Sequence, residues 1–320
     1  MINKIAVITP GGDAPGMNPA VRAVVREGLV RGSEVYGVRH GYRGLIDGDI
    51  ERFNLRSVSG IINRGGTMLG TRRCQDMKTK EGQERAIANL AGRGIEGLVV
   101  IGGDGSMQGG AVLSRAGIKV IGIPASIDND IFGTDETIGF DTAVNTSVEA
   151  IDKIRDTAAS HDRIFIVEVM GREHGFLALS VGLAAGAEFI LVPEVPLKIA
   201  ELSAALNTER HRNKTSVIIV FAEGVGNPFD FAGQLRTVVP EEIRVSSLGY
   251  IQRGGTPSAR SRILACRFGA HAVEMLSQNR TNEVVVLQGD VVTSIPLETC
   301  VNGVKKLDDK LYNLAGRLSQ

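Results

Sequence analysis

Three short apolar runs that end in glycines or carboxylates constrain the fold of this chain more than any other feature. In chain order, the runs and the residues that follow them are Ile5–Ile8 with Gly11–Asp13, Leu98–Ile101 with Gly102–Ser106, and Ile118–Ile123 with Pro124–Asp130. Short apolar runs bounded by turn residues are typical of buried parallel strands. An open sheet of such strands binds ligands beyond their carboxyl ends. The pattern therefore predicts an α/β protein with its site at these strand ends.

The residues at these strand ends indicate what the site handles. Asp128 and Asp130 follow a buried strand, where a carboxylate needs a proton to accept, a metal ion or cationic partners. Asp104 stands among glycines and suits Mg²⁺, which binds oxygen ligands and usually bridges to substrate phosphates. A helix directly after Gly103–Ser106 would present backbone N–H groups to phosphate. We interpret the site as phosphate-handling and metal-dependent.

Composition narrows the class of protein. The chain has 320 residues, 43% of them hydrophobic, with 36 basic and 36 acidic side chains. This balance gives no reason to expect nucleic acid or a membrane as a partner. The three cysteines (Cys74, Cys266 and Cys300) form no CxxC pair and suggest no disulfide framework. No apolar run is long enough to span a bilayer and no signal peptide is evident, so we expect a cytoplasmic protein.

Periodicity and turn residues predict two successive sets of β/α units, and hence two lobes. Further strands are expected at 35–38, 163–170, 188–192, 216–222, 242–248 and 283–287, and helices at 18–29, 81–92, 141–159, 258–277 and 307–318. Asn18 followed by Pro19 predicts a helix start with Asn18 as the capping residue. Residues 40–44 are expected to form a loop that either covers a nucleotide or is a simple turn around a packed Tyr42.

Two features stay ambiguous at the level of residue pattern. Arg22 and Arg26 are four residues apart on one helix face, which fits either an anion site or a solvated surface. His174 follows a strand and fits either a general base or a structural loop residue.

Together these motifs closely resemble those of the bacterial 6-phosphofructokinases. The matching segments are GGDAPGMN (11–18), INRGGTMLGTRR (62–73), VVIGGDGS (99–106), PASIDNDI (124–131), EAIDKIRDTAASHDR (149–163), VEVMGR (167–172) and LGYIQRGGTP (248–257). The resemblance runs from the first strand past residue 260 in common order and spacing. The resemblance implies two similar three-layer α/β/α lobes with mainly parallel sheets. It implies an ATP-binding lobe of residues 1–139 plus 255–302 and a sugar-phosphate lobe of 140–254 plus 303–320.

The resemblance also implies a reaction, in which the γ-phosphoryl group of ATP passes to the 1-hydroxyl of fructose 6-phosphate. Asp128 matches the general base, Asp104 the Mg²⁺-associated carboxylate, and Asp130 a residue that supports the metal and phosphate region. Ser126 stands where the family usually has Thr, and Arg73 and Gly12 complete the catalytic positions. The expected ATP-binding residues are Gly12, Tyr42, Arg73, Cys74, Gly103, Asp104, Gly105 and Ser106.

The family's sugar-phosphate contacts also have counterparts in this sequence. They are Ser126, Ile127, Asp128, Arg163, Met170, Gly171, Arg172, Glu223, Arg244, Tyr250 and Arg253, with Arg163 supplied by a neighbouring subunit. Tyr250 replaces the usual His, and a Tyr can donate a hydrogen bond but cannot carry positive charge. The family assembles as a homotetramer, which we expect here as well.

A second ligand site is implied between subunits, where the family binds ADP or phosphoenolpyruvate as an effector. The matching residues are Arg22, Arg26, Arg56, Arg155, Glu188, Arg212 and Lys214. Leu55 replaces one arginine of that site, which predicts an altered strength or ligand.

Two positions bear on the phosphoryl donor. Pyrophosphate-dependent relatives typically carry Asp at the position of Gly105 and Lys at that of Ala125, so both residues here favour ATP. The remaining alternatives are a pyrophosphate-dependent enzyme, a non-catalytic nucleotide or sugar-phosphate sensor, and another GGDG kinase. Asp104, Asp128 and Asp130 are all present, which argues against the sensor, and the segments PASIDND and YIQRGG argue against the other kinases.

Overall fold

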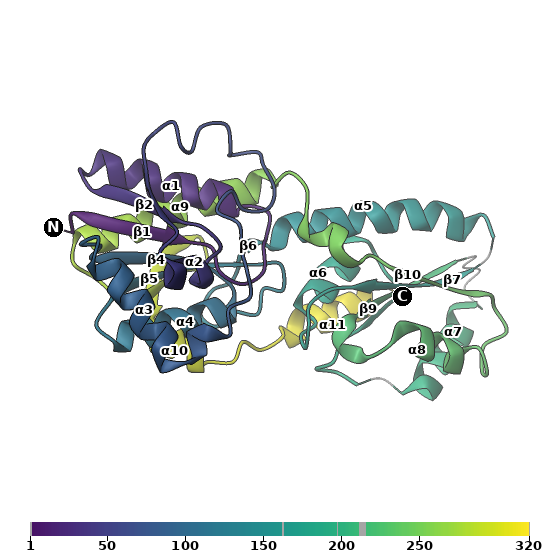
Figure 1. Cartoon of the computed structure of the whole chain (residues 1–320). Coiled ribbons are helices and arrows are strands. Elements are labelled where there is room, and N and C mark those ends of the chain that lie inside the picture. The colour runs from purple at the N-terminus through teal and green to yellow at the C-terminus, as the bar shows by residue number, and fades with distance from the viewer. Residues whose placement is uncertain (1, 162, 197, 211–215, 320) are drawn as a thin grey trace. The chain divides into compact units, whose positions relative to one another are not determined.

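A computed structural model describes residues 2–161, 163–196, 198–210 and 216–319 of the chain (Figure 1). These residues divide into two compact units, one of residues 1–142 with 253–305 and the other of 143–252 with 306–320. The divisions lie within a few residues of the lobe boundaries expected from the sequence. Each unit is built around its own sheet, as the two sets of β/α units predict.

The sheet of the first unit has the strand order β12-β11-β5-β4-β1-β2-β3, and β6 also pairs with β5. Its strands are β1 (Lys4–Ile8), β2 (Glu34–Val38), β3 (Ile50–Phe53), β4 (Gly97–Gly102), β5 (Lys119–Ser126), β6 (Ile138–Gly139), β11 (Glu283–Gln288) and β12 (Val291–Pro296). The central strands pair in parallel, whereas β3 and β12 close the two edges antiparallel. The sequence analysis missed both edge strands, because their alternating residues are only half-buried.

Helices cover both faces of this sheet, with α1 and α9 on one side and α3, α4 and α10 on the other (Figure 1). They are α1 (Met17–Val30), α2 (Tyr42–Asp47), α3 (Lys80–Ala91), α4 (Asp104–Arg115), α9 (Ala259–Ser277) and α10 (Leu297–Asn302), with a 3-10 turn at Asp76–Lys78. Because both faces are covered, every residue of β4 is buried. Helices α1 and α9 approach closely, since a Cβ atom at Gly269 would lie 2.6 Å from that of Ala23.

The second unit has a four-stranded sheet of order β10-β7-β9-β8, in which all pairs are parallel. Its strands are β7 (Ile164–Val169), β8 (Phe189–Leu191), β9 (Val217–Ala222) and β10 (Ile243–Ser247). Its helices are α5 (Phe140–Ala159), α6 (Phe176–Ala184), α7 (Ile199–Arg210), α8 (Pro228–Leu235) and α11 (Asp309–Leu318), with 3-10 turns at Glu223–Val225 and Gly249–Arg253. The mostly parallel sheets and their helices confirm the predicted fold class.

Two local predictions in the first unit are wrong. Residues 40–44 are not a loop throughout, because α2 begins at Tyr42. Asn18 does not cap α1, which begins at Met17 after Gly16. The Asn18 side chain is instead buried, donates to the carbonyls of Arg64 and Gly65, and accepts from the N–H of Met68. Tertiary contact with the 64–68 segment therefore overrides the local capping preference of Asn18.

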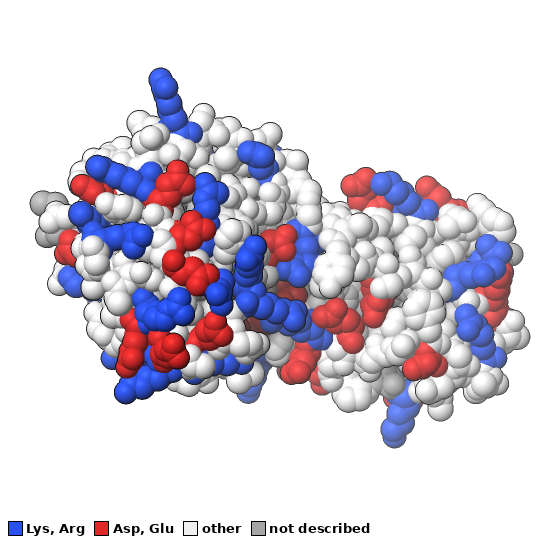
Figure 2. Space-filling model, viewed as in Figure 1, with Lys and Arg blue, Asp and Glu red and all other residues white. Residues whose placement is uncertain are grey.

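Charge is evenly spread over the face of the molecule drawn in Figure 2, where blue and red side chains alternate without a large patch of one sign. Oppositely charged side chains pair directly at several places in the described chain, as Arg43 does with Asp47 and Asp76. All three cysteines are free thiols. None of the helices in the described ranges is both long and apolar enough to cross a membrane.

Candidate active site

The first glycine turn joins β1 to α1 and needs its glycines for two different reasons. Gly11 and Gly16 have φ angles of 86° and 112°, which side chains rarely adopt. At Gly12 the reason is space, because a Cβ atom there would lie 2.4 Å from Nη2 of Arg253. Nη2 of Arg253 donates to Oδ1 of Asp13 at 2.9 Å, within the first unit. Arg253, expected to bind sugar phosphate, is thus held beside the first glycine turn.

The second glycine turn joins β4 to α4 and is fixed to the first. Ser106 is buried, and its Oγ donates to the carbonyl of Pro10 at 2.8 Å. A Cβ atom at Gly102 would lie 2.4 Å from this Oγ, so a glycine is required there. Asp104 is the first residue of α4 and accepts from Nε2 of Gln108 at 2.7 Å. Its carboxylate lies at the helix end where negative charge is stabilised.

Tyr42 lies behind the second turn rather than over it. Its side chain is buried in the core, and its hydroxyl donates to the carbonyl of Ser106 at 2.6 Å. A Cβ atom at Gly109 would lie 2.5 Å from the tyrosine ring, so the ring packs directly on α4. Burial raises the pKa of the Tyr42 phenol well above its usual range. Of the two alternatives for residues 40–44, the packed Tyr42 therefore agrees with the structure better than a loop that covers a nucleotide.

The end of β5, which carries Asp128 and Asp130, lies beside the second glycine turn. A Cβ atom at Gly103 would lie 3.8 Å from the Cβ of Ser126, so the ends of β4 and β5 adjoin. Oγ of Ser126 accepts from the N–H of Asp128 at 3.1 Å, and Asp128 is only 5% exposed. Ile127, between them, is buried as well. The sequence prediction that three strand ends adjoin holds for Pro10, Ser106 and Ser126.

Asp130 carries an observation that bears on a metal ion. Its Oδ1 is buried and has no hydrogen-bond partner among the described residues. A buried carboxylate oxygen without a partner is costly, and a cation would satisfy it. In the described part of the chain, no three His, Cys, Asp or Glu side chains form a cage for a metal. Asp104 and Asp130 therefore suit Mg²⁺, which commonly takes one or two carboxylates and completes its shell from phosphates and water.

The remaining residues expected at the nucleotide are more exposed. A Cβ atom at Gly105 would meet nothing within 4 Å, so this position borders open space. Arg73 is exposed in the irregular segment before the 3-10 turn at Asp76–Lys78. Cys74, the next residue, packs against the core of the first unit.

In the second unit, the strand ends gather the residues expected at the sugar. Gly171 and Arg172 follow β7 with φ angles of 141° and 53°. This conformation turns the N–H of Arg172 to Oε1 of Glu223, which follows β9. The N–H of Met170 donates to Oε1 of Gln252 at 3.2 Å. Tyr250 is 79% exposed in the turn that contains Gln252. The structure thus joins Met170 to the 249–252 turn and Arg172 to Glu223.

Two functional supports in this unit were missed by the sequence analysis. Gln252 is completely buried, accepts from Met170 and Ser147, and donates to the carbonyl of Gly249. Glu242 forms ion pairs with both Arg163 and Arg244 at the start of β7 and β10. The Arg163 hydrogen bond holds the pKa of Glu242 below its usual range. In the sequence, Gln252 and Glu242 could have been recognised only as polar residues that stand beside a motif.

The residues expected at an effector site are divided between the two units. In the second, Arg155 lies 3.5 Å from Oε1 of Glu188 and also donates to the carbonyls of Ala185 and Gly186. In the first, Arg22 and Arg26 lie on α1, and Nε of Arg26 is buried without a hydrogen-bond partner among the described residues. Arg56 stands in the turn after β3. Arg212 and Lys214 lie outside the described residues.

His174 has a structural environment. It lies 3.6 Å from Glu194, whose carboxylate also accepts from the N–H of Gly175 at the start of α6. Its ring packs against that of Phe176. These contacts support the structural alternative for His174 and hold the loop that follows Arg172.

Comparison with known proteins identifies the family of this chain. The phosphofructokinase family model matches residues 4–276. The chain is 49% identical over 318 residues to the ATP-dependent 6-phosphofructokinase of Shouchella clausii, and 50% identical over 318 residues to that of Bacillus subtilis. Each match covers 99% of this chain and 100% of the relative. The solved T-state phosphofructokinase of Pichia pastoris matches with a TM-score of 0.90 and 33% identity, over 99% of this chain and 36% of that longer one. The chain belongs to the phosphofructokinase family.

Proposed function

We propose that the chain is an ATP-dependent 6-phosphofructokinase, which phosphorylates fructose 6-phosphate at the 1-hydroxyl and releases ADP. The observation that carries this proposal is the pair of carboxylates at the end of β5, Asp128 and Asp130, beside two glycine turns. Full-length relatives with about half of their residues identical bear the same name. Phosphoryl transfer needs positioning, charge neutralisation and a base for the attacking hydroxyl. The glycine turns provide the positioning and Asp128 the base, while Arg73 and a bound Mg²⁺ would neutralise the charge.

Each residue of the first unit has a proposed task. Asp128 accepts the proton of the sugar 1-hydroxyl, and the Ser126 hydroxyl donates to the transferring phosphoryl group. Gly12, Gly103, Gly105 and Ser106 let the backbone approach the phosphates of ATP, while Tyr42 supports their turn from behind. Arg73 supplies positive charge to the developing transition state, and Cys74 borders the nucleotide.

Asp104 and Asp130 would hold a Mg²⁺ ion at this site. The buried, unpartnered Oδ1 of Asp130 supports this assignment. When bound, the ion neutralises charge on the phosphates of ATP. The protein itself contributes Asp128, which accepts the proton, and Ser126 and Arg73, which orient and stabilise the phosphoryl group.

The second unit supplies most of the sugar-phosphate residues of this proposal, and Arg253 of the first unit joins them. Glu223 accepts from the sugar hydroxyls, Met170, Gly171 and Arg172 shape the loop around the sugar, and Arg253 and Tyr250 contact the ligand from their own segment. Arg163 and Arg244 bind the 6-phosphate, because forked guanidinium donors match phosphate oxygens. Their shared partner Glu242 keeps both side chains in place until phosphate arrives.

Assembly and regulation form a further part of the proposal. We infer a homotetramer in which Arg163 acts in the site of a neighbouring subunit. An effector site for ADP or phosphoenolpyruvate is proposed from Arg22, Arg26, Arg56, Arg155, Glu188, Arg212 and Lys214. The pairing of Arg155 with Glu188 supports it, as does the partnerless Nε of Arg26.

ATP rather than pyrophosphate is the proposed donor. A side chain at Gly105 would point into open space that the α-phosphate of ATP can occupy, and Ala125 brings no cation for pyrophosphate. The fold by itself does not distinguish the two donors.

The deciding experiment is a coupled assay with purified protein, fructose 6-phosphate and Mg²⁺, run with ATP and separately with pyrophosphate. We expect turnover with ATP alone, and phosphorus NMR of the product should show two phosphate esters on one sugar. Turnover with pyrophosphate alone would overturn the donor assignment. An Asp128→Asn chain serves as the matched blank, and a folded wild-type protein with no turnover on either donor would overturn the enzyme proposal.

A further inference from the structure

Asn129 stands between the two carboxylates and has an unusual backbone conformation. Its φ angle is 53°, in the left-handed region that non-glycine residues adopt only where the surroundings support it. The residue is 6% exposed, although its side chain is polar. Because consecutive residues share their backbone, the dihedral angles at this position set the directions in which Asp128 and Asp130 project.

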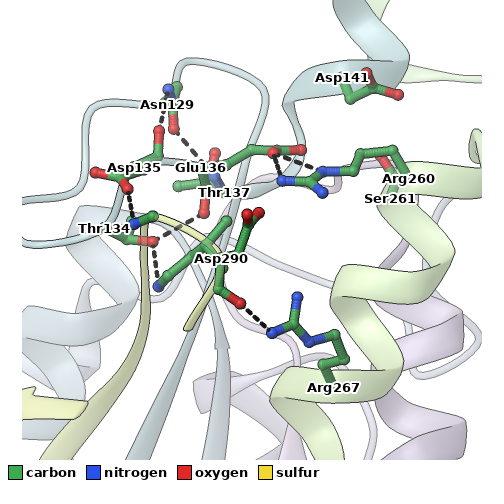
Figure 3. A network of polar contacts seen from close by, with 12 residues as sticks. Asn129, Thr134, Asp135, Glu136, Thr137, Asp141, Arg260, Ser261, Arg267 and Asp290 are labelled. Atoms are coloured by element: carbon green, nitrogen blue, oxygen red, sulfur yellow. Dashed lines mark hydrogen bonds and ion pairs between the residues drawn. The ribbon is translucent and has the colours of Figure 1, made fainter. Parts of the chain in front are cut away.

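Both ends of the Asn129 amide are used to close the loop that follows (Figure 3). Its Nδ2 donates to the carbonyl of Asp135 at 3.1 Å, and its Oδ1 accepts from the N–H of Thr137 at 3.0 Å. Oγ1 of Thr137 in turn donates to the carbonyl of Ser126 at 2.5 Å. The hydrogen bonds between Asn129 and Thr137 and between Thr137 and Ser126 close a ring with the backbone of residues 126–129, and Asp128 is part of that ring.

The outer side of the loop is anchored to the rest of the first unit. Nζ of Lys305 donates to the same Asp135 carbonyl at 3.2 Å, and Oδ2 of Asp135 accepts from the N–H of Gly289. Glu136 pairs with Arg260 of α9 at 2.9 Å, as Figure 3 shows. The loop is therefore a fixed support, and Asn129 is the side chain that links Asp128 and Asp130 to it.

We propose that Asn129 is a positioning residue, whose amide holds the Asp128 carboxylate and the Asp130 oxygen in the orientation that phosphoryl transfer requires. This inference rests on the proposed function of Asp128 as the base. It predicts that loss of the amide damages the chemical step more than substrate binding, because the other residues that bind ATP and sugar phosphate keep their places. Misplacing a reacting group by about 1 Å can lower a rate about 100-fold.

The test is Asn129→Gly, which tolerates the left-handed backbone and removes both side-chain hydrogen bonds. Asn279→Gly is the matched control, because Asn279 is exposed, has a φ angle of 59° and makes one side-chain contact, with half-buried Lys119. Assays are run at neutral pH, because burial lowers the pKa of Lys305 to about 8 and its charge must stay constant. For Asn129→Gly we expect kcat to fall about 10- to 100-fold. The KM values for ATP and fructose 6-phosphate should change less than about threefold, and the Mg²⁺ concentration for half activity should rise.

A second variant protects the test against a folding defect. Asn129→Asp keeps the shape and still accepts from Thr137, but it can no longer donate to Asp135 and adds a negative charge between Asp128 and Asp130, so its kcat should be lower than that of wild type. Unchanged kcat in folded Asn129→Gly would overturn the inference, and so would a loss no larger than that of Asn279→Gly. If Asn129→Gly does not fold, unchanged kcat in Asn129→Asp would overturn it. Wild-type turnover in the same assay separates this outcome from failure of the proposed function, which would leave the wild type inactive.

Discussion

Asp128 is the residue on which the proposed chemistry depends most directly. Replacing it by Asn keeps the size and the hydrogen bond from its N–H to Ser126, but removes the base. We expect kcat to fall by about 10²–10⁴ while the KM values change little, because general-base catalysis acts in the transition state. Steady-state kinetics with Asp290→Asn, the same change at an exposed turn of the first unit, provide the control. Turnover that survives intact would remove Asp128 from the role of base.

The proposed support of the second glycine turn by Tyr42 can be tested by removing its hydroxyl group. In Tyr42→Phe the Ser106 carbonyl loses its 2.6 Å hydrogen bond in the core, which should lower the free energy of unfolding by about 1–2 kcal/mol. The KM for ATP should rise, because Ser106 belongs to the second glycine turn. Tyr312→Phe is the matched variant, since it removes a hydroxyl that donates to Ile190 in the second unit. Equal effects of the two variants on the KM for ATP would contradict the support role of Tyr42.

At the scale of helices, the packing of α1 against α9 depends on Gly269. An added Cβ atom would lie 2.6 Å from the Cβ of Ala23 and 3.0 Å from the carbonyl of Ala20. We expect Gly269→Ala to destabilise the protein by about 1–3 kcal/mol, as overpacked cores do. Gly316→Ala in α11 meets no atom within 4 Å and should be neutral or stabilising by up to about 1 kcal/mol. Urea denaturation of both variants measures the difference, and a stable Gly269→Ala would show that the helices have room to separate.

For the whole molecule, the decisive question is whether a site draws on two subunits. Asp128→Asn and Arg163→Ser chains should each be nearly inactive alone. If Arg163 acts in a neighbouring subunit, mixing and reassembling the two chains should restore activity, because some sites then combine an intact Asp128 with an intact Arg163. Activity of the mixture is compared with that of each chain put through the same procedure. No gain in mixtures whose hybrid assembly is verified by mass would place Arg163 in the site of its own chain.

The sequence by itself determined the strands that form the site and the residue types at their ends. Buried parallel strands such as β4 need continuous apolar residues, and glycines and carboxylates after such strands are unusual enough to be recognised in one chain. The half-buried edge strands β3 and β12 carry a weaker pattern and were missed for that reason.

Only the tertiary structure decided what each polar side chain contacts. The local sequence predicts Asn18 as a helix cap, yet its amide holds the 64–68 segment. The local sequence also predicts Tyr42 as a loop residue, yet it is buried behind Ser106. Gln252, Glu242 and Asn129 each contact at least one partner that is distant in sequence: Met170, Arg163 and Asp135 lie 82, 79 and 6 residues away. Apolar periodicity reports burial, which is a property of one segment. A hydrogen bond depends on where a second segment lies, and that position exists only once the chain has folded.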